Sequence, residues 1–438
     1  MAKSTQLNQW LWKWHVIAGL ACLPVVAVLC ATGSIYLFKD NFNDYRYQDA
    51  RFIEAPANAK LAPYQQQLNA AKEHTDHSIM SVSLPSHPEQ AASFREHAKG
   101  HSRNLIYVNP YTAKVSGTYE QADSLMYKVR KLHGELLLGD TGSLVVELVA
   151  SWFIVLALTG IYIWWPARSF TDKEGKVRKG GFFTIRRNNG QRFFWRDMHA
   201  VIAFWMSVFL LVILAGGMPW TTLFGDNLKW VQKQTDTGYP QHWRNAKGLK
   251  SELSLELSSE RGSNNTTNSL SLDKVVAIAK AQNLDGEITI KLPKNDEGVY
   301  TIANRSLWLE QQKVIHIDQY SGDVIKSLNW SQVGILMDLR QVFMRLHQGE
   351  YGKANLIVVL IVALSFLLAT IASLTSYLLR KPNGSWGIPK PPKSFKPGVF
   401  VTLMIVGLAL LFPAFGISAL VIFIAEFSIR RLSKKRST

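Results

Sequence analysis

The sequence predicts a membrane protein with an all-α bundle of four core transmembrane helices and two α+β domains outside the membrane. Four apolar stretches are each long enough to cross a bilayer, which takes about 20 residues of helix. Longer segments of mixed polarity follow the first and the third stretch. A histidine stands at or just before the start of each stretch, at matching places in the two halves of the chain. Such matched positions indicate an internal duplication.

The apolar stretches lie at residues 16–38, 142–165, 199–218 and 354–379. A fifth apolar region, 398–425, contains Pro413 and forms either one helix or a hairpin that turns near this proline. The hairpin keeps the basic C-terminal tail on the same side as the other basic loops, so we favour it. The predicted parts are 1–38 (tail and first span), 39–130 (first outer domain), 131–166 (second span), 167–196 (basic loop), 197–220 (third span), 221–345 (second outer domain), 346–380 (fourth span), 381–397 (loop) and 398–438 (apolar helix or hairpin with a basic tail).

The net charge of +17 is concentrated in short loops. Lysines and arginines outnumber acidic residues in the loops 167–196 and 381–397, which adjoin predicted spans. This distribution marks the cytoplasmic side of a membrane protein. We therefore expect a multi-pass protein in contact with lipid, with its N-terminus in the cytoplasm. A nucleic-acid partner is disfavoured, because no soluble basic domain exists to bind one.

The two outer segments show the same order of predicted elements. In the first, a helical pattern at 61–74 precedes alternating strands at 79–84 and 104–108. In the second, a helix at 272–282 precedes strands at 287–292 and 299–303. We expect each segment to form one small α+β module, with a polar insertion at 258–269 in the second.

The topology sorts the four histidines into two pairs. Helices that start at His15 and His199 run outward, whereas helices that follow His133 and His347 run inward. An imidazole near hydrocarbon is costly unless it has a partner. Facing side chains of a bundle commonly build cofactor sites, and a six-coordinate haem iron takes one axial ligand from each side. The sequence therefore predicts an inner haem between His15 and His199 and an outer haem between His133 and His347.

Two other interpretations of the histidines remain. They could be interfacial side chains without a ligand, although four at matched positions favour a cofactor. Zinc or copper is a further alternative, but two histidines on each side are too few for a tetrahedral zinc site.

Four charged side chains are candidates for a supporting role around these sites. Lys13, Arg192 and Arg196 could pair with the propionates of the inner haem. Glu147, near the outer end of the second span, could relay protons or tune the outer haem, or it could simply lie at the membrane interface. No motif of a soluble catalytic site accompanies them, and the catalytic residues stay unknown.

Several motifs of the chain resemble the PepSY-associated transmembrane family of iron-regulated bacterial inner-membrane proteins. They are Trp14-His15-Val16-Ile17-Ala18-Gly19, Leu132-His133-Gly134-Glu135, Leu158-Thr159-Gly160-Ile161, Trp195-Arg196-Asp197-Met198-His199, Gly217-Met218-Pro219-Trp220 and Leu346-His347-Gln348-Gly349-Glu350. The resemblance covers the chain up to about residue 379. It implies four core helices, two periplasmic PepSY-type domains and, in members linked to siderophore use, two b-type haems that pass electrons outward to a ferric siderophore. By position, His15 and His199 would hold the inner haem, and His133 and His347 the outer one. The insertion at 258–269 and the C-terminal apolar region depart from the family pattern.

We therefore expect a di-haem electron-transfer protein of the bacterial inner membrane. It would take electrons from a cytoplasmic or quinol donor and reduce a periplasmic acceptor such as a ferric siderophore. The alternative is a non-enzymatic membrane sensor or protease-regulating protein that binds peptides with its PepSY-like domains. A siderophore transporter is a third possibility, but the first four spans lack the discontinuous helices of such proteins.

Overall fold

The computed structural model describes residues 2–56, 59–97, 103–165, 170–171, 177–178, 182–251, 269–389 and 397–435. The chain divides into two units. A helical unit comprises Met1–Leu37, Val129–Val231 and Arg340–Thr438, and a sheet unit comprises Phe38–Lys128 and Gln232–Leu339. Most of the polar insertion at 258–269 and part of the basic loop 167–196 lie outside the described residues.

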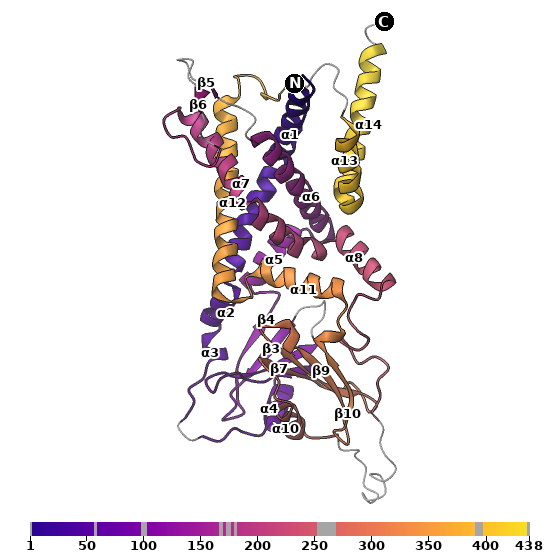
Figure 1. Cartoon of the computed structure of the whole chain (residues 1–438). Coiled ribbons are helices and arrows are strands. Elements are labelled where there is room, and N and C mark those ends of the chain that lie inside the picture. Colours follow the sequence, from indigo (N-terminus) through magenta and orange to yellow (C-terminus); the bar gives the residue numbers. More distant parts are fainter. Residues whose placement is uncertain are drawn as a thin grey trace, which may run out of the picture. The chain divides into compact units, whose positions relative to one another are not determined.

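Four long helices form the core of the helical unit (Figure 1). They are α1 (Ala2–Tyr36), α6 (Gly139–Trp164), α7 (Gln191–Gly217) and α12 (Gly352–Arg380). All four are long and apolar enough to span a membrane, so the chain is a multi-pass membrane protein. Apolar side chains of α1 and α6 pack together, among them Cys22, Val26 and Val149. A second cluster joins Leu210 of α7 to Phe366 of α12.

Two shorter helices precede α6 and α12. They are α5 (Leu125–Glu135) and α11 (Ile335–Gln348), and they carry His133 and His347. The predicted parts 131–166 and 346–380 thus each contain the end of a short helix and a separate long helix. The breaks between these helices use left-handed backbone at Gly139, Gly349 and Gly352, a conformation that favours glycine.

The C-terminal apolar region forms two helices, α13 (Val399–Leu411) and α14 (Pro413–Lys435). A Cβ atom added at Gly416 would lie 2.6 Å from the carbonyl oxygen of Ala409. These residues would be about 10 Å apart along one straight helix, so the chain bends sharply at Phe412.

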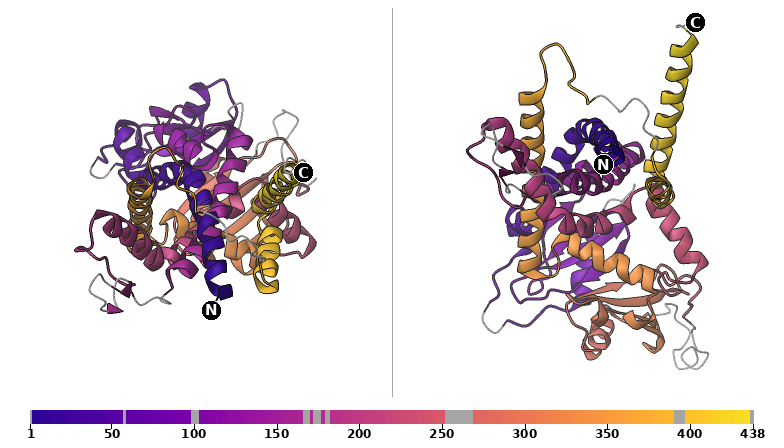
Figure 2. Two further views of the ribbon diagram at one scale, coloured as in Figure 1. Left: turned by 90° about the horizontal axis from the view of Figure 1, so that it is seen from above. Right: turned by 45° about the horizontal axis from the view of Figure 1, so that its top comes forward.

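Contacts with the core helices show where α14 runs. The Trp152 indole donates to the Ser418 hydroxyl at 3.0 Å, midway along α6. Lys13, near the start of α1, pairs with Glu426 at 3.3 Å. Helix α14 therefore returns from the middle of the bundle toward the end that carries His15, as the hairpin interpretation requires (Figure 2).

The sheet unit contains one antiparallel sheet of eight strands. The strands are β1 (Ile79–Ser83), β2 (Ala92–His97), β3 (Arg103–Val108), β4 (Val115–Glu120), β7 (Glu287–Lys291), β8 (Val299–Arg305), β9 (Lys313–Asp318) and β10 (Val324–Asn329). Their order is β10-β9-β8-β7-β1-β2-β3-β4. Strand β1 of the first segment pairs with β7 of the second, for example at Val82 and Ile290. Pairing these two strands removes two exposed sheet edges. The segments therefore share one sheet instead of forming the two separate domains predicted from the sequence.

Both segments follow the same order of elements. Helix α4 (Tyr64–Glu73) precedes β1 to β4, and α10 (Leu272–Ala281) precedes β7 to β10. The two helices cover one face of the sheet (Figure 1), and Phe94 and Ile302 lie fully buried in that core. The remaining elements are short: α2 (Lys39–Arg46), α3 (Gln48–Arg51), β5 (Phe170–Thr171), β6 (Val177–Arg178), α8 (Leu223–Gln234), and the 3-10 turns Met218–Trp220, Leu309–Gln311 and Trp330–Gln332.

Candidate functional site

The structure brings the four histidines together in the two pairs that the topology predicts. The rings of His15 and His199 lie with their centroids 6.4 Å apart. The rings of His133 and His347 lie with their centroids 6.1 Å apart. All four side chains are half-buried and belong to the helical unit.

In the first half of the chain, a threonine hydroxyl holds the Nδ1 atom of each histidine. His15 Nδ1 lies 2.9 Å from Thr159 Oγ1, and His133 Nδ1 lies 3.1 Å from Thr32 Oγ1. Both hydroxyls also donate to the carbonyl oxygen four residues earlier in their own helix, at 2.8 Å and 2.6 Å. A hydroxyl has one proton, so each threonine can only accept from the imidazole. The Nδ1 atoms of these two histidines therefore carry the proton.

In the second half, a backbone carbonyl takes the place of the threonine. His199 Nδ1 donates to Ala369 O at 3.0 Å, and His347 Nδ1 donates to Ile213 O at 2.7 Å. A carbonyl oxygen cannot donate, so these Nδ1 atoms also carry the proton. The hydrogen-bond network thus assigns one tautomer to all four rings, in which Nε2 has a free lone pair.

Glycines let the rings lie directly against the neighbouring helices. A Cβ atom added at Gly160 would lie 3.2 Å from Cε1 of His15, and one added at Gly33 would lie 3.1 Å from Cε1 of His133. A Cβ atom added at Gly217 would likewise lie 3.2 Å from Cε1 of His347. A larger residue at these positions would push the ring aside.

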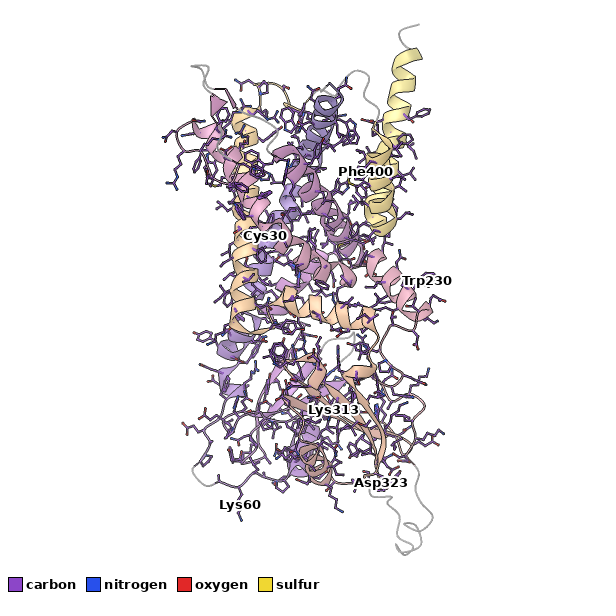
Figure 3. All side chains as sticks on the ribbon, in the orientation of Figure 1. Cys30, Lys60, Trp230, Lys313, Asp323 and Phe400 are labelled. Atoms are coloured by element: carbon purple, nitrogen blue, oxygen red, sulfur yellow. The ribbon has the colours of Figure 1, made fainter. Side chains whose placement is uncertain are left out.

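The two pairs are linked through α1. This helix carries His15 near one end and Thr32, the partner of His133, near the other. The difference of 17 residues (32 − 15) corresponds to about 26 Å along a helix. Figure 3 labels Cys30, two residues before Thr32. We call the two regions the His15 end and the His133 end of the bundle.

The geometry of each pair fits an ion held between two imidazole nitrogens. With metal–nitrogen bonds of about 2.0–2.1 Å, the two ring centroids would lie roughly 6.3 Å apart, close to the 6.4 Å and 6.1 Å observed. The centroid distance is thus compatible with one iron bound by both imidazoles of a pair.

A zinc site fits less well. Among the residues that the structure describes, no group of three or more His, Cys, Asp or Glu side chains is placed to hold a metal ion. Structural and catalytic zinc sites use three or four protein ligands. Each histidine pair supplies only two imidazoles, which is fewer than such a site requires.

The three cationic candidates lie at the His15 end of the bundle. Lys13 is engaged by Glu426 and stacks over the Trp14 ring at 4.7 Å. Arg196 donates to Asp197 at 2.7 Å and stacks over Phe193. Arg192 lies in the first turn of α7 and is exposed. Lys13 and Arg196 are thus already held by carboxylates of the chain itself.

Asp197 is an important residue that the sequence analysis missed. Its side chain is fully buried, two residues before His199. It accepts two hydrogen bonds from Arg186, at 2.6 Å and 2.9 Å, as well as those from Arg196. A bidentate charged pair of this kind holds the start of α7 in place and therefore fixes the position of His199. Only its place in the Trp195-Arg196-Asp197-Met198-His199 motif could have indicated it.

Glu147 caps a helix. The side chain is fully buried, and its two oxygens accept the backbone amides of Leu223 at 2.8 Å and Phe224 at 3.1 Å. These residues begin α8, whose unpaired amides and dipole favour a carboxylate. The structure thus accounts for Glu147 without the relay or tuning role suggested from the sequence.

Comparison with known proteins agrees with this architecture. A family model described as "PepSY-associated TM region" matches residues 12–383, which include all four histidines. A search among curated proteins finds no match for the chain. The family match covers well over half of the sequence, so the chain belongs to the family of proteins with a PepSY-associated TM region.

Proposed function

We propose that this protein carries electrons across a bacterial inner membrane through two haem b groups and reduces a ferric siderophore on the periplasmic side. The observation that carries the proposal is the presence of two opposed histidine pairs, one near each end of a four-helix bundle. His15 of one pair and Thr32, the partner of His133 in the other, lie about 26 Å apart along α1, so the two pairs belong to different ends of the bundle.

The chain supplies the ligands and fixes their orientation. Nε2 of His15 and His199 would bind one iron, and Nε2 of His133 and His347 the other. The four Nδ1–H groups are held by Thr159, Thr32 and two backbone carbonyls, which fixes the orientation of each ring and would keep its Nε2 available to an iron. The bound haem contributes reversible one-electron chemistry at its iron.

The positive charges support the direction of transfer. The loops 167–196 and 381–397 carry an excess of lysine and arginine and adjoin the His15 end of the bundle. By the positive-inside rule this end, with the N-terminus, faces the cytoplasm, and the sheet unit is periplasmic. Arg192, exposed at the start of α7, is then the best placed of the three cationic candidates to meet a propionate of the inner haem.

The overall step is the transfer of one electron to each ferric ion. A cytoplasmic reductant or a quinol loses the electron, and the Fe(III) of the chelate becomes Fe(II). Siderophores bind through hard oxygen ligands, which hold Fe(II) less tightly than Fe(III). Reduction therefore releases the iron.

Absorption spectra of the purified full-length protein, before and after reduction with dithionite, test the proposal. We expect two six-coordinate low-spin b-type haems for each chain. His15→Ala and His133→Ala should each lose one haem and keep the other, whereas His87→Ala, which changes an exposed histidine of the sheet unit, should lose neither. Absence of haem from protein made with ample haem supply would defeat the proposal and favour a peptide-binding membrane sensor.

A further inference from the structure

An aromatic pair lies in the interior of the helical unit. Phe153 of α6 and Phe366 of α12 meet edge to face, with ring centroids 5.3 Å apart and an angle of 81° between the ring planes. Phe366 is buried, and Phe153 is half-buried. The contact is favourable because the positive edge of one ring points at the negative face of the other. The pair therefore ties α6 to α12.

This contact crosses the centre of the bundle. Helix α1 packs against α6 and α12, and α7 packs against the same two helices. In a four-helix bundle of this order, α6 and α12 stand on one diagonal, and α1 and α7 stand on the other. His15 and His199 face each other along the α1–α7 diagonal. The two phenyl rings meet along the α6–α12 diagonal, so they lie at the axis of the bundle.

The position of the rings along the axis follows from the partners of the first histidine pair. Helices α6 and α12 both run toward the His15 end, where Thr159 and Ala369 accept the Nδ1–H groups. Phe153 precedes Thr159 by six residues (159 − 153), which corresponds to about 9 Å of helix. Phe366 precedes Ala369 by three residues (369 − 366), about 4.5 Å of helix. Both rings are thus displaced from this pair toward the His133 end.

The apolar neighbours of the rings continue in the same direction. Phe366 packs with Leu210 of α7, and Phe153 packs against the same cluster. Leu210 precedes Ile213, whose carbonyl accepts the Nδ1–H of His347, by three residues (213 − 210), or about 4.5 Å of helix. The cluster thus reaches from about one turn beyond the acceptors of one histidine pair to about one turn from an acceptor of the other.

Closely packed atoms favour electron tunnelling between two centres. The electronic coupling decays faster through empty space than through atoms in van der Waals contact. Protein interiors are packed as densely as organic crystals, and a smaller side chain in such an interior leaves part of the volume empty. Rings that fill the axis between the two histidine pairs therefore provide a continuous path.

We propose that the contact between Phe153 and Phe366 couples the two haem sites, so that an electron passes from the His15 end to the His133 end through these rings. The inference rests on the proposed function, because it names the path between its two sites. In this step the iron at the His15 end goes from Fe(II) to Fe(III), and the iron at the His133 end goes from Fe(III) to Fe(II). The rings are neither oxidised nor reduced, and no bond breaks.

Flash photoreduction of the full-length protein in sealed lipid vesicles tests the proposal. A membrane-impermeant ruthenium tris-bipyridine complex with a sacrificial donor delivers one electron to the end that faces outward. The electron then redistributes between the two sites, whose separate spectra come from His15→Ala and His133→Ala. Neither of these variants should show the redistribution phase, which assigns that phase in the wild type.

We expect Phe153→Leu and Phe366→Leu each to slow the redistribution several-fold, because leucine does not fill the space of a phenyl ring. Haem content and both midpoint potentials should stay unchanged. Phe153→Tyr keeps the ring and should keep the rate close to that of the wild type. Unfolding of the apoprotein tests the contact itself, since the losses of stability in the two leucine variants should not add in the double variant.

The matched control is Phe415→Leu. Phe415 of α14 meets Trp152 edge to face, with ring centroids 4.9 Å apart. Trp152 is the neighbour of Phe153 in α6 and also donates to Ser418 of α14, so this contact lies between α6 and α14 at the same level of the bundle. Loss of the ring at Phe415 should leave the redistribution rate unchanged.

Three results would overturn the inference and leave the electron-transfer proposal standing. They are an unchanged rate in both leucine variants, equal slowing in Phe415→Leu, and slowing that shifted midpoint potentials account for. Additive losses of stability would also overturn it, since they would show that the rings do not interact. Protein that binds no haem under ample supply would reject the electron-transfer proposal itself, and the inference with it.

Discussion

Thr32 of α1 accepts a hydrogen bond from Nδ1 of His133 at 3.1 Å, although 101 positions separate the two residues. Likewise, the Thr159 hydroxyl of α6 accepts a hydrogen bond from Nδ1 of His15 in α1 at 2.9 Å. Helix α1 thus carries a histidine of one pair and the partner of a histidine of the other. This reciprocal arrangement couples the orientation of both pairs to the packing of α1 against α5 and α6.

Thr32→Val should selectively weaken the haem site that we propose between His133 and His347. Valine has nearly the same shape but cannot accept the Nδ1–H, so His133 loses its orientation and part of its basicity. Loss of such a partner typically costs about 10–100-fold in metal affinity. Haem content and the potential of the remaining outer haem should both change in a redox titration, whereas Thr32→Ser should restore them. Unchanged potentials in Thr32→Val would show that the hydroxyl does not act on the histidine.

Gly33→Val should displace His133 by steric pressure. A Cβ atom at this position already comes within 3.1 Å of the imidazole, and the γ-carbons of valine need more room. The outer haem should be lost while the inner haem stays, as judged from haem content per chain. The control is Gly407→Val in α13, where a Cβ atom would meet nothing within 4 Å. Equal haem loss in both variants would point to general destabilisation.

Much of the architecture could be predicted from the sequence because apolar length and histidine spacing are local features. Apolar length predicts the four spans. Histidine spacing, together with the direction of each span, predicts the pairing of His15 with His199 and of His133 with His347. Strand β2 was missed because its apolar alternation is limited to Ala92 and Phe94. The pairing of β1 with β7, which joins the two segments into one sheet, depends on contacts between residues some 200 positions apart.

The hydrogen-bond partners of the histidines also depend on long-range contacts, so the sequence did not predict them. The Thr-Gly pairs at 32–33 and 159–160 are visible in the sequence, but their relation to the histidines is not. Which histidine each threonine contacts depends on how α1 packs against α5 and α6. The role of Glu147 could not be predicted, since a buried carboxylate in a span is equally compatible with capping and with proton relay. Only the position of the first α8 amides distinguishes the two.

Glu147→Ala should lower the stability of the helical unit without changing its haem spectra. The substitution leaves the amides of Leu223 and Phe224, which lie against the buried side chain of residue 147, without an acceptor, which costs about 1–3 kcal/mol. Thermal unfolding in detergent should show the loss, and Glu147→Gln, which keeps one acceptor oxygen, should show a smaller one. A shifted potential of the outer haem at unchanged stability would instead support the tuning role.

His316 should make the sheet unit less stable in acid. Burial lowers the pKa of His316 below its usual value of about 6.5, so the folded protein binds fewer protons at this residue than the unfolded chain does. Its contribution to stability is therefore complete above pH ~6.5 and is lost as the pH falls below that value, by at most about 1.4 kcal/mol per pH unit. Unfolding by urea at a series of pH values should show this slope, and His316→Gln should reduce it. The matched control His87→Gln changes an exposed histidine and should keep the slope. An equal slope in His316→Gln would assign the acid sensitivity to other groups.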